Sequence, residues 1–217
     1  MDSSLHIEVK CNERAQFHSR LRGRKGSGKS TLVHTLAQHA PRLFVFDVMG
    51  EHKWVPNAFN DLDDVDDFLG WASTQQTFAG RYVPQSHATE GLDLICEWIY
   101  DLGNTLFIVE EIAMLCSPSF LPPELDRIVR LGRHQGVDFL WTCQRLAEVA
   151  RRLTAATDSF ILFRHSEPRD LDAIADRCGR DVAEKISRLG LHDYLVWGVI
   201  EGRETDLNEC ARELAAR

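Results

Sequence analysis

A glycine-rich segment near the amino end has the residue types and spacing of a phosphate-binding loop. Residues Gly23 to Ser30 read Gly-Arg-Lys-Gly-Ser-Gly-Lys-Ser and fit the pattern Gly-x-x-x-x-Gly-Lys-Ser/Thr. Gly26 and Gly28 allow the backbone to turn tightly and to bring its N–H groups against phosphate oxygens. A helix that follows directly adds the positive end of its dipole to the same anion. The alternative is an ordinary glycine-rich surface loop.

The loop predicts a nucleoside triphosphate with Mg²⁺ as its ligand. Lys29 supplies a point charge to the β- and γ-phosphates, and Ser30 offers a hydroxyl oxygen to Mg²⁺. Thr31 is expected to contact the α-phosphate. The predicted nucleotide-binding residues are Gly23, Arg24, Lys25, Gly26, Ser27, Gly28, Lys29, Ser30 and Thr31.

Two glutamates follow directly on an apolar run. Leu106 to Val109 predicts a buried strand, and Glu110 and Glu111 come at its end. A magnesium nucleotide site needs one carboxylate near the metal and an acid that orients the attacking water. We assign Glu110 to the magnesium shell and Glu111 to the role of general base. The alternative is a strand end with solvated charge. Asp47, which ends another apolar run, is either a supporting group or a turn residue.

A glutamine ends a further apolar run, and a basic turn precedes that run. Gln144 closes the run 139–144, at the edge where a nucleotide should bind. Its amide can bond both the γ-phosphate and the attacking water, and so sense hydrolysis. In the turn 130–136, Arg133, with Arg130 in reserve, can reach the phosphates of a neighbouring subunit as an arginine finger. The alternative is a surface loop with solvated arginines.

The charge balance limits the possible partners. The chain has 217 residues with 25 Lys and Arg against 33 Asp and Glu, a formal net charge of -8. This argues against a generally basic surface that coats nucleic acid, but it leaves room for a local basic channel. Arg145, Arg151 and Arg152 either face nucleic acid or are ordinary surface charge.

The cysteines and the chain start indicate a reducing cytoplasm. The six cysteines form no Cys-x-x-Cys pair, which argues against zinc and favours reduced thiols. The polar stretch Met1 to Ala15 is unlike a signal peptide. No apolar run approaches the roughly 20 residues that span a bilayer.

The elements that must position these residues alternate between strand and helix. Strands are predicted at 17–21, 43–46, 81–84, 106–109, 139–144, 159–163 and 194–197. Helices are predicted at 30–39, 61–67, 92–102 and 123–131, and from Pro168 onward. The acidic helix 61–67 is expected to present a solvated face, with metal binding as the alternative. The alternation indicates an α/β fold with a mostly parallel central sheet and helices on both faces.

These motifs, in this order, resemble the FtsK–HerA superfamily of DNA-pumping ATPases. Within it, they are most similar to the genome-packaging ATPases of membrane-containing icosahedral viruses. The resemblance runs from about Gly23 to about Trp197. Besides the two motifs above, it is carried by Gly-Arg-His-Gln-Gly-Val at 132–137, Thr-Cys-Gln-Arg at 142–145 and Phe-Arg-His-Ser-Glu-Pro-Arg-Asp-Leu at 163–171. Two features depart from the family: Glu110 stands where Asp is usual, and the strand before the glycine loop is polar.

The resemblance implies a RecA-like P-loop core that binds ATP and Mg²⁺. It implies a homo-oligomeric ring, commonly a hexamer, with double-stranded DNA threaded through its centre. The implied catalytic residues are Glu111, Lys29, Gln144 as sensor and Arg133 in trans, and the implied metal ligands are Ser30 and Glu110. A viral portal vertex or membrane-associated packaging proteins would be further partners, in the host cytoplasm or at the packaging vertex.

The expected domain organisation is simple, and two other functions remain open. Residues 1–20 are an arm or short strands, 21–200 the P-loop ATPase domain and 201–217 a strand or helix extension. One alternative is a cellular pump of the same superfamily, in repair or conjugation. The other is a P-loop kinase or a nucleotide-dependent switch. The sequence contains neither the Asn-Lys-x-Asp of a GTPase nor the Leu-Ser-Gly-Gly of an ABC-type ATPase.

Overall fold

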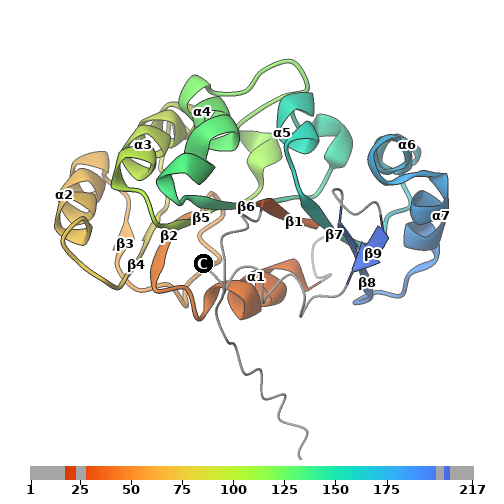
Figure 1. Cartoon of the computed structure of the whole chain (residues 1–217), viewed down its shortest axis with the longest axis horizontal. Coiled ribbons are helices and arrows are strands. Elements are labelled where there is room, and N and C mark those ends of the chain that lie inside the picture. The colour runs from red at the N-terminus through yellow and green to blue at the C-terminus, as the bar shows by residue number, and fades with distance from the viewer. Residues whose placement is uncertain (1–17, 23–27, 199–202, 206–217) are drawn as a thin grey trace, which may run out of the picture.

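The computed structural model describes residues 18–22, 28–198 and 203–205 (Figure 1). The predicted loop residues Gly23, Arg24, Lys25, Gly26 and Ser27 lie outside this described part. So do most of the residues assigned to the amino-terminal arm and the carboxyl-terminal extension, and those domain boundaries stay predictions. Within the described residues, no helix combines the length and the apolar character needed to cross a membrane.

The described strands form one sheet in the order β3-β4-β2-β5-β6-β1-β7-β8-β9. All neighbours from β3 to β7 pair in parallel, whereas β8 and β9 join the edge antiparallel. The strands are β1 His18–Arg22, β2 Arg42–Phe46, β3 Ala58–Phe59, β4 Phe78–Tyr82, β5 Leu106–Val109, β6 Asp138–Cys143, β7 Ser159–Phe163, β8 Tyr194–Gly198 and β9 Arg203–Thr205.

Helices cover both faces of this sheet. In Figure 1, α1 lies below the sheet, α2 to α5 lie above it, and α6 and α7 stand beside its β7–β8 end. The α-helices are α1 Lys29–Ala37, α2 Leu62–Ala72, α3 Ala88–Leu102, α4 Pro123–Leu131, α5 Arg151–Ala155, α6 Pro168–Cys178 and α7 Arg180–Arg188. Short 3₁₀ helices are η1 Ile112–Met114, η2 Gly132–Gln135 and η3 Leu146–Glu148. The predicted α/β fold, RecA-like with a mostly parallel sheet, is confirmed.

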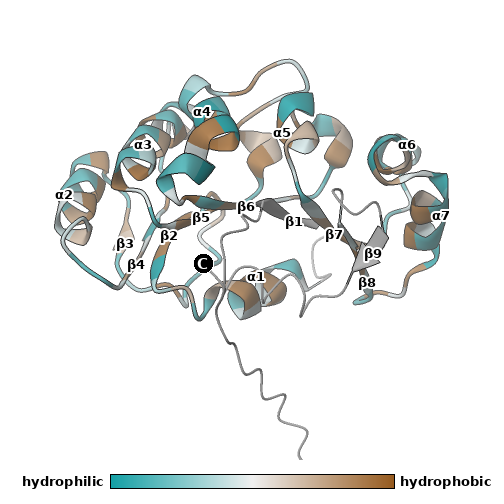
Figure 2. Cartoon of the chain, in the orientation of Figure 1, coloured by the Kyte–Doolittle hydropathy of each residue, from teal (hydrophilic) through white to brown (hydrophobic). Residues whose placement is uncertain are grey.

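The alternation of side chains along each strand divides the core into two layers. Phe44 and Phe107 belong to the cluster that packs against α2, α3 and α4. Their neighbours Val45 and Ile108 belong to the cluster beneath, which contains the apolar residues of α1. Because both faces are covered, these strands are continuous apolar runs in the sequence. Figure 2 shows the hydrophobic residues concentrated along the sheet and on the helix sides that face it.

Several elements differ from the predicted ones for local reasons. The strand predicted at 81–84 is β4, which begins earlier because Phe78 is buried beside β2. The acidic helix begins after Asp61, whose side chain accepts the Asp63 N–H at 2.9 Å and so caps α2. The elements β3 and α5 were not predicted, since they are too short to show a clear apolar period. The helix α7 was not predicted as separate from the helix that begins at Pro168, although its buried residues Val182, Ala183 and Ile186 have helical spacing.

Candidate nucleotide-binding and catalytic site

The carboxyl ends of the parallel strands bring the predicted chemistry together. Glu110 and Glu111 follow β5, Gln144 follows β6, and Lys29 begins α1 after β1. Because β6 lies between β5 and β1, these ends are neighbours at one edge of the sheet. They border one cavity of about 740 Å³. Its lining consists of Gly28, Lys29, Ser30, Thr31, Leu32, Thr35, Met49, Glu51, Glu110, Glu111, Gln144, Phe163, His192 and Tyr194.

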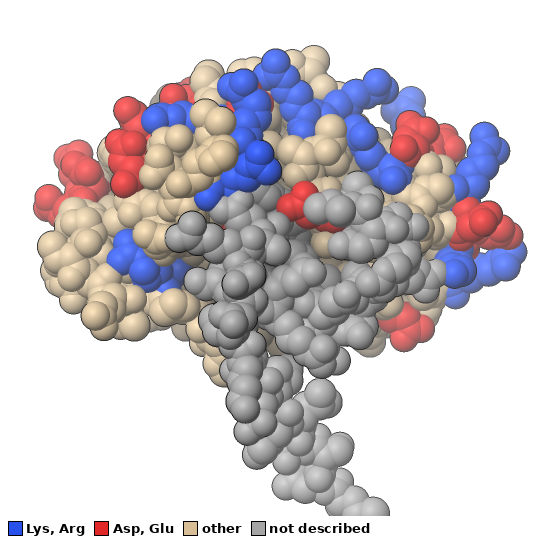
Figure 3. All heavy atoms as spheres, viewed as in Figure 1, with Lys and Arg blue, Asp and Glu red and all other residues tan. Residues whose placement is uncertain are grey.

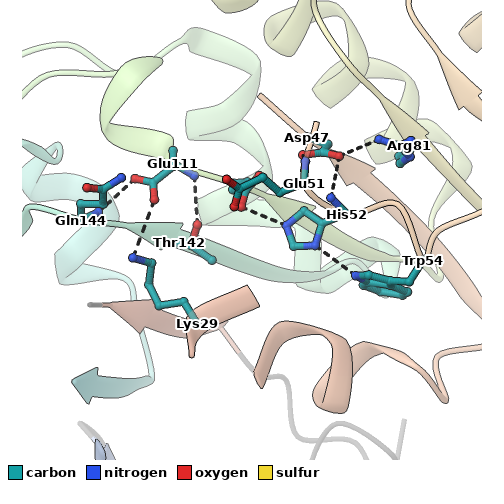
Figure 4. Close-up of polar contacts among 10 residues, drawn as sticks. Lys29, Asp47, Glu51, His52, Trp54, Arg81, Glu111, Thr142 and Gln144 are labelled. Carbon is teal, nitrogen blue, oxygen red and sulfur yellow. Dashed lines mark hydrogen bonds and ion pairs between the residues drawn. The ribbon is translucent and has the colours of Figure 1, made fainter. Parts of the chain in front are cut away.

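Lys29 and Glu111 lie in direct contact within this cavity. The Nζ atom of Lys29 is 3.9 Å from Oε1 of Glu111, and both residues are buried (Figure 4). Gly28 precedes the lysine with a φ of 95°, a left-handed conformation that glycine adopts without strain. Burial lowers the pKa of Lys29, and the nearby carboxylate of Glu111 partly opposes that shift. The ammonium group of Lys29 and the carboxylate of Glu111 thus lie side by side where little water reaches them. Charged groups in such surroundings are typical of functional sites.

The backbone at Glu111 is held in an unusual conformation. Its φ of 46° and ψ of 49° place a non-glycine residue in the left-handed region. Its N–H donates to Oγ1 of Thr142 at 2.9 Å, and its Oε2 accepts the Gln144 N–H at 3.1 Å. Strain of this kind persists only where neighbouring groups hold it, and it is enriched at functional sites. The contact from Gln144 comes from its backbone, while its side chain is exposed at the cavity.

Glu110 has a partner that the sequence analysis did not identify. Its Oε1 lies 3.2 Å from Nε2 of the buried His52, and its Oε2 is buried without a hydrogen bond in the described structure. The ring of His52 is fixed from its other side, because Nδ1 accepts the indole N–H of Trp54 at 3.2 Å. Figure 4 shows this row of contacts beside the Lys29–Glu111 pair. Glu110 therefore borders the cavity with one oxygen engaged and one available.

Asp47 anchors the loop that carries His52. Its carboxylate is fully buried and accepts the N–H groups of Glu51 and His52, each at 3.0 Å. It also accepts a bond from Nη1 of Arg81 at 2.8 Å. Asp47 was expected to be either a group that supports the site or a turn residue. These contacts favour the first role, because they hold the loop that carries His52. Asp47, His52 and Glu110 offer ligand atoms within 4.8 Å of one another, yet the oxygens of Asp47 already accept these bonds.

The His52–Glu110 pair favours holding a proton. Burial by itself lowers the pKa of His52, but the hydrogen bond and charge of Glu110, with the charges of Asp47 and Glu51, outweigh it and raise that pKa. Burial raises the pKa of Glu110, and Asp47 adds to this rise while His52 opposes it. Both shifts act in the direction of proton retention.

An aromatic wall, formed by Phe163 and Tyr194, lines part of the cavity. Phe163 ends β7 and Tyr194 starts β8, and their ring centroids are 5.8 Å apart. His192, and Thr35 in the second turn of α1, belong to the same lining. The sequence analysis assigned no role to Phe163 and Tyr194, because the antiparallel pairing of β7 with β8 is what brings these two residues together.

Arg133 lies at the other edge of the sheet. It is an exposed residue of η2, which directly precedes β6 and therefore stands at the amino ends of the strands. The length of β6, about 20 Å for six residues, separates it from the cavity of its own chain. Arg130, named in reserve, has Nε 3.1 Å from Oδ2 of Asp126. Neither arginine belongs to the cavity of the described chain.

This fold is that of the P-loop NTPases with a RecA-like core. No protein-family model matches the chain. The genome-packaging NTPase B204 from Sulfolobus turreted icosahedral virus 2, solved in complex with AMPPCP, has the same fold. Its TM-score is 0.71 at 21% identity, over 87% of this chain and 95% of that one. The likeness to genome-packaging ATPases that the sequence predicted is thus confirmed at the level of fold.

Three other known proteins are also similar to this chain, two in structure and one in sequence. B204 from Sulfolobus turreted icosahedral virus, a DNA-packaging ATPase, matches with a TM-score of 0.66 at 20% identity, over 87% of this chain and 95% of that one. VirB4 of Thermoanaerobacter pseudethanolicus matches with a TM-score of 0.60 at 10% identity, over 86% and 87%. In sequence, a guanylate kinase from Synechococcus sp. (strain JA-3-3Ab) is 28% identical over 64% of this chain and 70% of that protein.

Proposed function

We propose that this protein is an ATPase that uses hydrolysis to move double-stranded DNA. One observation carries the enzymatic part: the Lys29–Glu111 pair, 3.9 Å apart, borders the same cavity as Ser30 and Gln144. In this arrangement, the ammonium group of Lys29 can bind phosphate and the carboxylate of Glu111 can bind the attacking water. The side-chain amide of Gln144 borders the same cavity. The fold shared with packaging NTPases that bind ATP analogues supports ATP as the substrate.

In the proposed reaction, each side chain has a separate task. Lys29 binds the β- and γ-phosphates and neutralises charge that develops as the phosphoryl group leaves. Glu111 accepts a hydrogen bond from the attacking water and takes its proton as general base. The side chain of Gln144 contacts the γ-phosphate region and registers its loss. Since the Gln144 N–H holds the Glu111 carboxylate, the base and the sensor are mechanically linked.

The residues around Glu110 fit a magnesium ion. Mg²⁺ prefers oxygen ligands, and the cavity offers the hydroxyl of Ser30 and the carboxylate of Glu110. The buried Oε2 of Glu110, which accepts no hydrogen bond from the described residues, is the atom best suited to this role. When bound, the ion would neutralise charge on the β- and γ-phosphates. His52 would act at one remove, by orienting Glu110.

The proposal extends to a homo-oligomeric ring, in the form of a hexamer, with hydrolysis at subunit boundaries. The position of Arg133, about 20 Å from the cavity of its own chain, supports a role in trans. The packaging function of B204 supports duplex DNA as the cargo, with a portal vertex or membrane-associated packaging proteins as further partners in the host cytoplasm or virion. A cellular DNA pump with the same core is the related alternative.

The test of this proposal is phosphate release by the purified protein with ATP and Mg²⁺, with and without duplex DNA. We expect turnover that duplex DNA stimulates, together with a nucleotide-dependent increase of the particle mass in solution. Absence of turnover under all these conditions would reject the ATPase assignment. Turnover that DNA never changes would reject the translocase assignment alone.

A second candidate function is a nucleotide kinase, which the 28% identity to a guanylate kinase favours. A kinase transfers the γ-phosphoryl group to an acceptor, whereas an ATPase releases it to water. Incubation with γ-labelled ATP and GMP separates the two. We expect labelled inorganic phosphate at a rate that GMP does not change, and formation of labelled GDP would favour the kinase.

The aromatic wall leads to a prediction about the nucleobase. With the phosphates at Lys29, the proposal places the base against Tyr194, a residue of the cavity lining that is 40% exposed. Stacking of a base on an aromatic ring contributes about 1–3 kcal/mol. We therefore expect Tyr194→Ala to weaken ATP binding by about tenfold or more, while the affinity for inorganic tripolyphosphate stays unchanged.

Competition with a fluorescent nucleotide measures both affinities for the Tyr194 variant. The matched control is Trp71→Ala, which removes an exposed aromatic ring from α2. Equal loss of ATP and tripolyphosphate affinity would show that Tyr194 acts on the phosphate site, contrary to this prediction.

A further inference from the structure

Four exposed arginines lie along α4, α5 and α6, in a protein whose formal net charge is -8. We call them the arginine ridge; its members are Arg130, Arg151, Arg152 and Arg177. Figure 3 shows Lys and Arg side chains running across the surface over α4 and α5. A local concentration of positive charge against an acidic background marks this surface for an anionic partner.

One buried carboxylate organises the first half of the ridge. Oδ2 of Asp126 lies 3.1 Å from Nε of Arg130 and 3.0 Å from Nη1 of Arg152. Asp126 itself is buried, whereas the two arginine side chains are 65% and 73% exposed. Two guanidinium groups are therefore held side by side by a single negative charge. Each keeps further N–H donors for an outside acceptor.

The second half of the ridge joins α5 to α6. Nη2 of Arg177 donates to the carbonyl oxygen of Arg151 at 3.4 Å. Among the described residues, the ion pairs of the four ridge arginines involve one carboxylate, that of Asp126. The positive charge of the four ridge arginines therefore exceeds the negative charge of the carboxylate with which they pair.

Neighbouring arginines show the contrasting arrangement. Arg145 is surrounded by carboxylates, with Glu167 at 3.0 Å, Glu148 at 3.3 Å and Asp170 at 3.8 Å. Its charge is neutralised within the protein, so it joins η3 to α6 and is poorly suited to contact nucleic acid. Arg145, Arg151 and Arg152 were expected either to face nucleic acid or to be ordinary surface charge. The ion pairs of Arg145 set it apart from Arg151 and Arg152, which belong to the ridge.

The ridge has the chemistry of a duplex backbone site. Guanidinium groups match phosphate oxygens in geometry and supply affinity without reading sequence. Single strands are bound through exposed aromatic platforms on which bases stack. Tyr100 of α3, the helix packed against α4, has its ring covered by the guanidinium of Arg127 at 3.8 Å. This favours the outer phosphates of a double helix over unpaired bases.

We propose that the arginine ridge is the surface through which this protein holds the phosphate backbone of double-stranded DNA. The inference rests on the proposed translocase function and names the part of the protein that meets the cargo. The ridge is distinct from the nucleotide cavity, since none of its residues lines that cavity. Loss of the ridge should therefore uncouple DNA binding from nucleotide chemistry.

The experiment measures the affinity of the full chain for a duplex oligonucleotide at several salt concentrations. The variant Arg151→Ala/Arg177→Ala removes two ridge charges without leaving a buried carboxylate unpaired. The variant Arg130→Ala/Arg152→Ala removes the Asp126-bound pair, and its thermal unfolding is followed alongside. We expect each double variant to bind DNA at least tenfold more weakly. The slope of log affinity against log salt should become less steep by about 2.

The control is Arg188→Ala, which removes an exposed arginine from α7 that pairs with Glu184. It should leave DNA affinity and its salt slope unchanged, and basal ATP hydrolysis should stay the same in this control and in Arg151→Ala/Arg177→Ala. If the unaltered protein binds DNA and both double variants match it in affinity and slope, the ridge assignment is wrong and the translocase proposal stands. If the unaltered protein hydrolyses ATP but binds no duplex at low salt, both assignments to DNA fall.

Discussion

Glu111→Gln is expected to abolish nearly all ATP hydrolysis while nucleotide binding survives. The amide keeps the size of the carboxylate, and its oxygen can still accept the Gln144 N–H that holds the side chain. It cannot take a proton from water at neutral pH, which removes general-base catalysis worth about 10²–10⁴-fold in rate. Phosphate release under saturating ATP measures the loss, and titration with a fluorescent nucleotide measures binding.

The contrast with Lys29→Ala makes this prediction specific. Removing the lysine takes away the cation for the phosphates, so that variant should lose affinity as well as turnover. Glu148→Gln serves as a surface control, because Glu148 is exposed and outside the cavity lining. A Glu111→Gln protein that retained more than about a tenth of the rate would assign the base to another group, since general-base catalysis contributes far more than that.

Asp47→Ala is expected to destabilise the folded protein by about 3 kcal/mol or more. The change leaves Arg81 without its partner at a position that is largely buried, and breaking a buried ion pair from one side costs about 3–5 kcal/mol. It also removes the acceptor of two backbone N–H groups, which belong to Glu51 and His52. Urea unfolding followed by circular dichroism gives the change in free energy from the shift in the midpoint.

The Arg81–Asp47 pair allows a sharper form of this measurement. Arg81→Met alone leaves a buried carboxylate unpaired, whereas the double variant removes both charges, so the double should be less destabilised than the sum of the singles. Asp66→Ala, on the exposed acidic face of α2, should change stability by less than about 0.5 kcal/mol. Additive losses in the cycle would mean that Asp47 acts through the backbone N–H groups and not through Arg81.

The consequence for activity follows from the same contacts. Asp47 holds the loop that carries His52, and His52 contacts Glu110. Loosening that loop should therefore reduce the gain in nucleotide affinity that Mg²⁺ produces. Under conditions where the variant remains folded, affinity in the presence of a chelator should change less than affinity with Mg²⁺. This links the stability of a buried ion pair to the geometry of the proposed metal ligand.

Local sequence patterns made the buried strands, and the site residues that follow them directly, predictable from the sequence. The strand β5 was predicted at its exact bounds, because a strand covered on both faces must be apolar throughout. The two glutamates at its end stand out for the same reason, since charge interrupts an otherwise buried run. The glycine loop pattern likewise depends on neighbouring residues alone, although residues 23–27 lie outside the described structure.

Contacts between distant segments could not be predicted in this way. His52 lies in a loop after β2, yet its partner follows β5, and Arg81 reaches Asp47 across β4 and β2. The Phe163–Tyr194 wall needs the antiparallel pairing of β7 with β8, which α6 and α7 separate in the sequence. The arginine ridge needs α4, α5 and α6 to lie side by side. None of these pairings leaves a periodic signal along the chain.

The sequence by itself thus determined which residue types end the buried strands and where a phosphate-binding loop should begin. The tertiary structure alone decided the order of strands, with β6 between β1 and β5, and so decided that Lys29, Glu111 and the Gln144 N–H meet. The physical reason is that hydrophobic periodicity records only whether a segment is buried. Which segments become neighbours depends on how all of them pack at once.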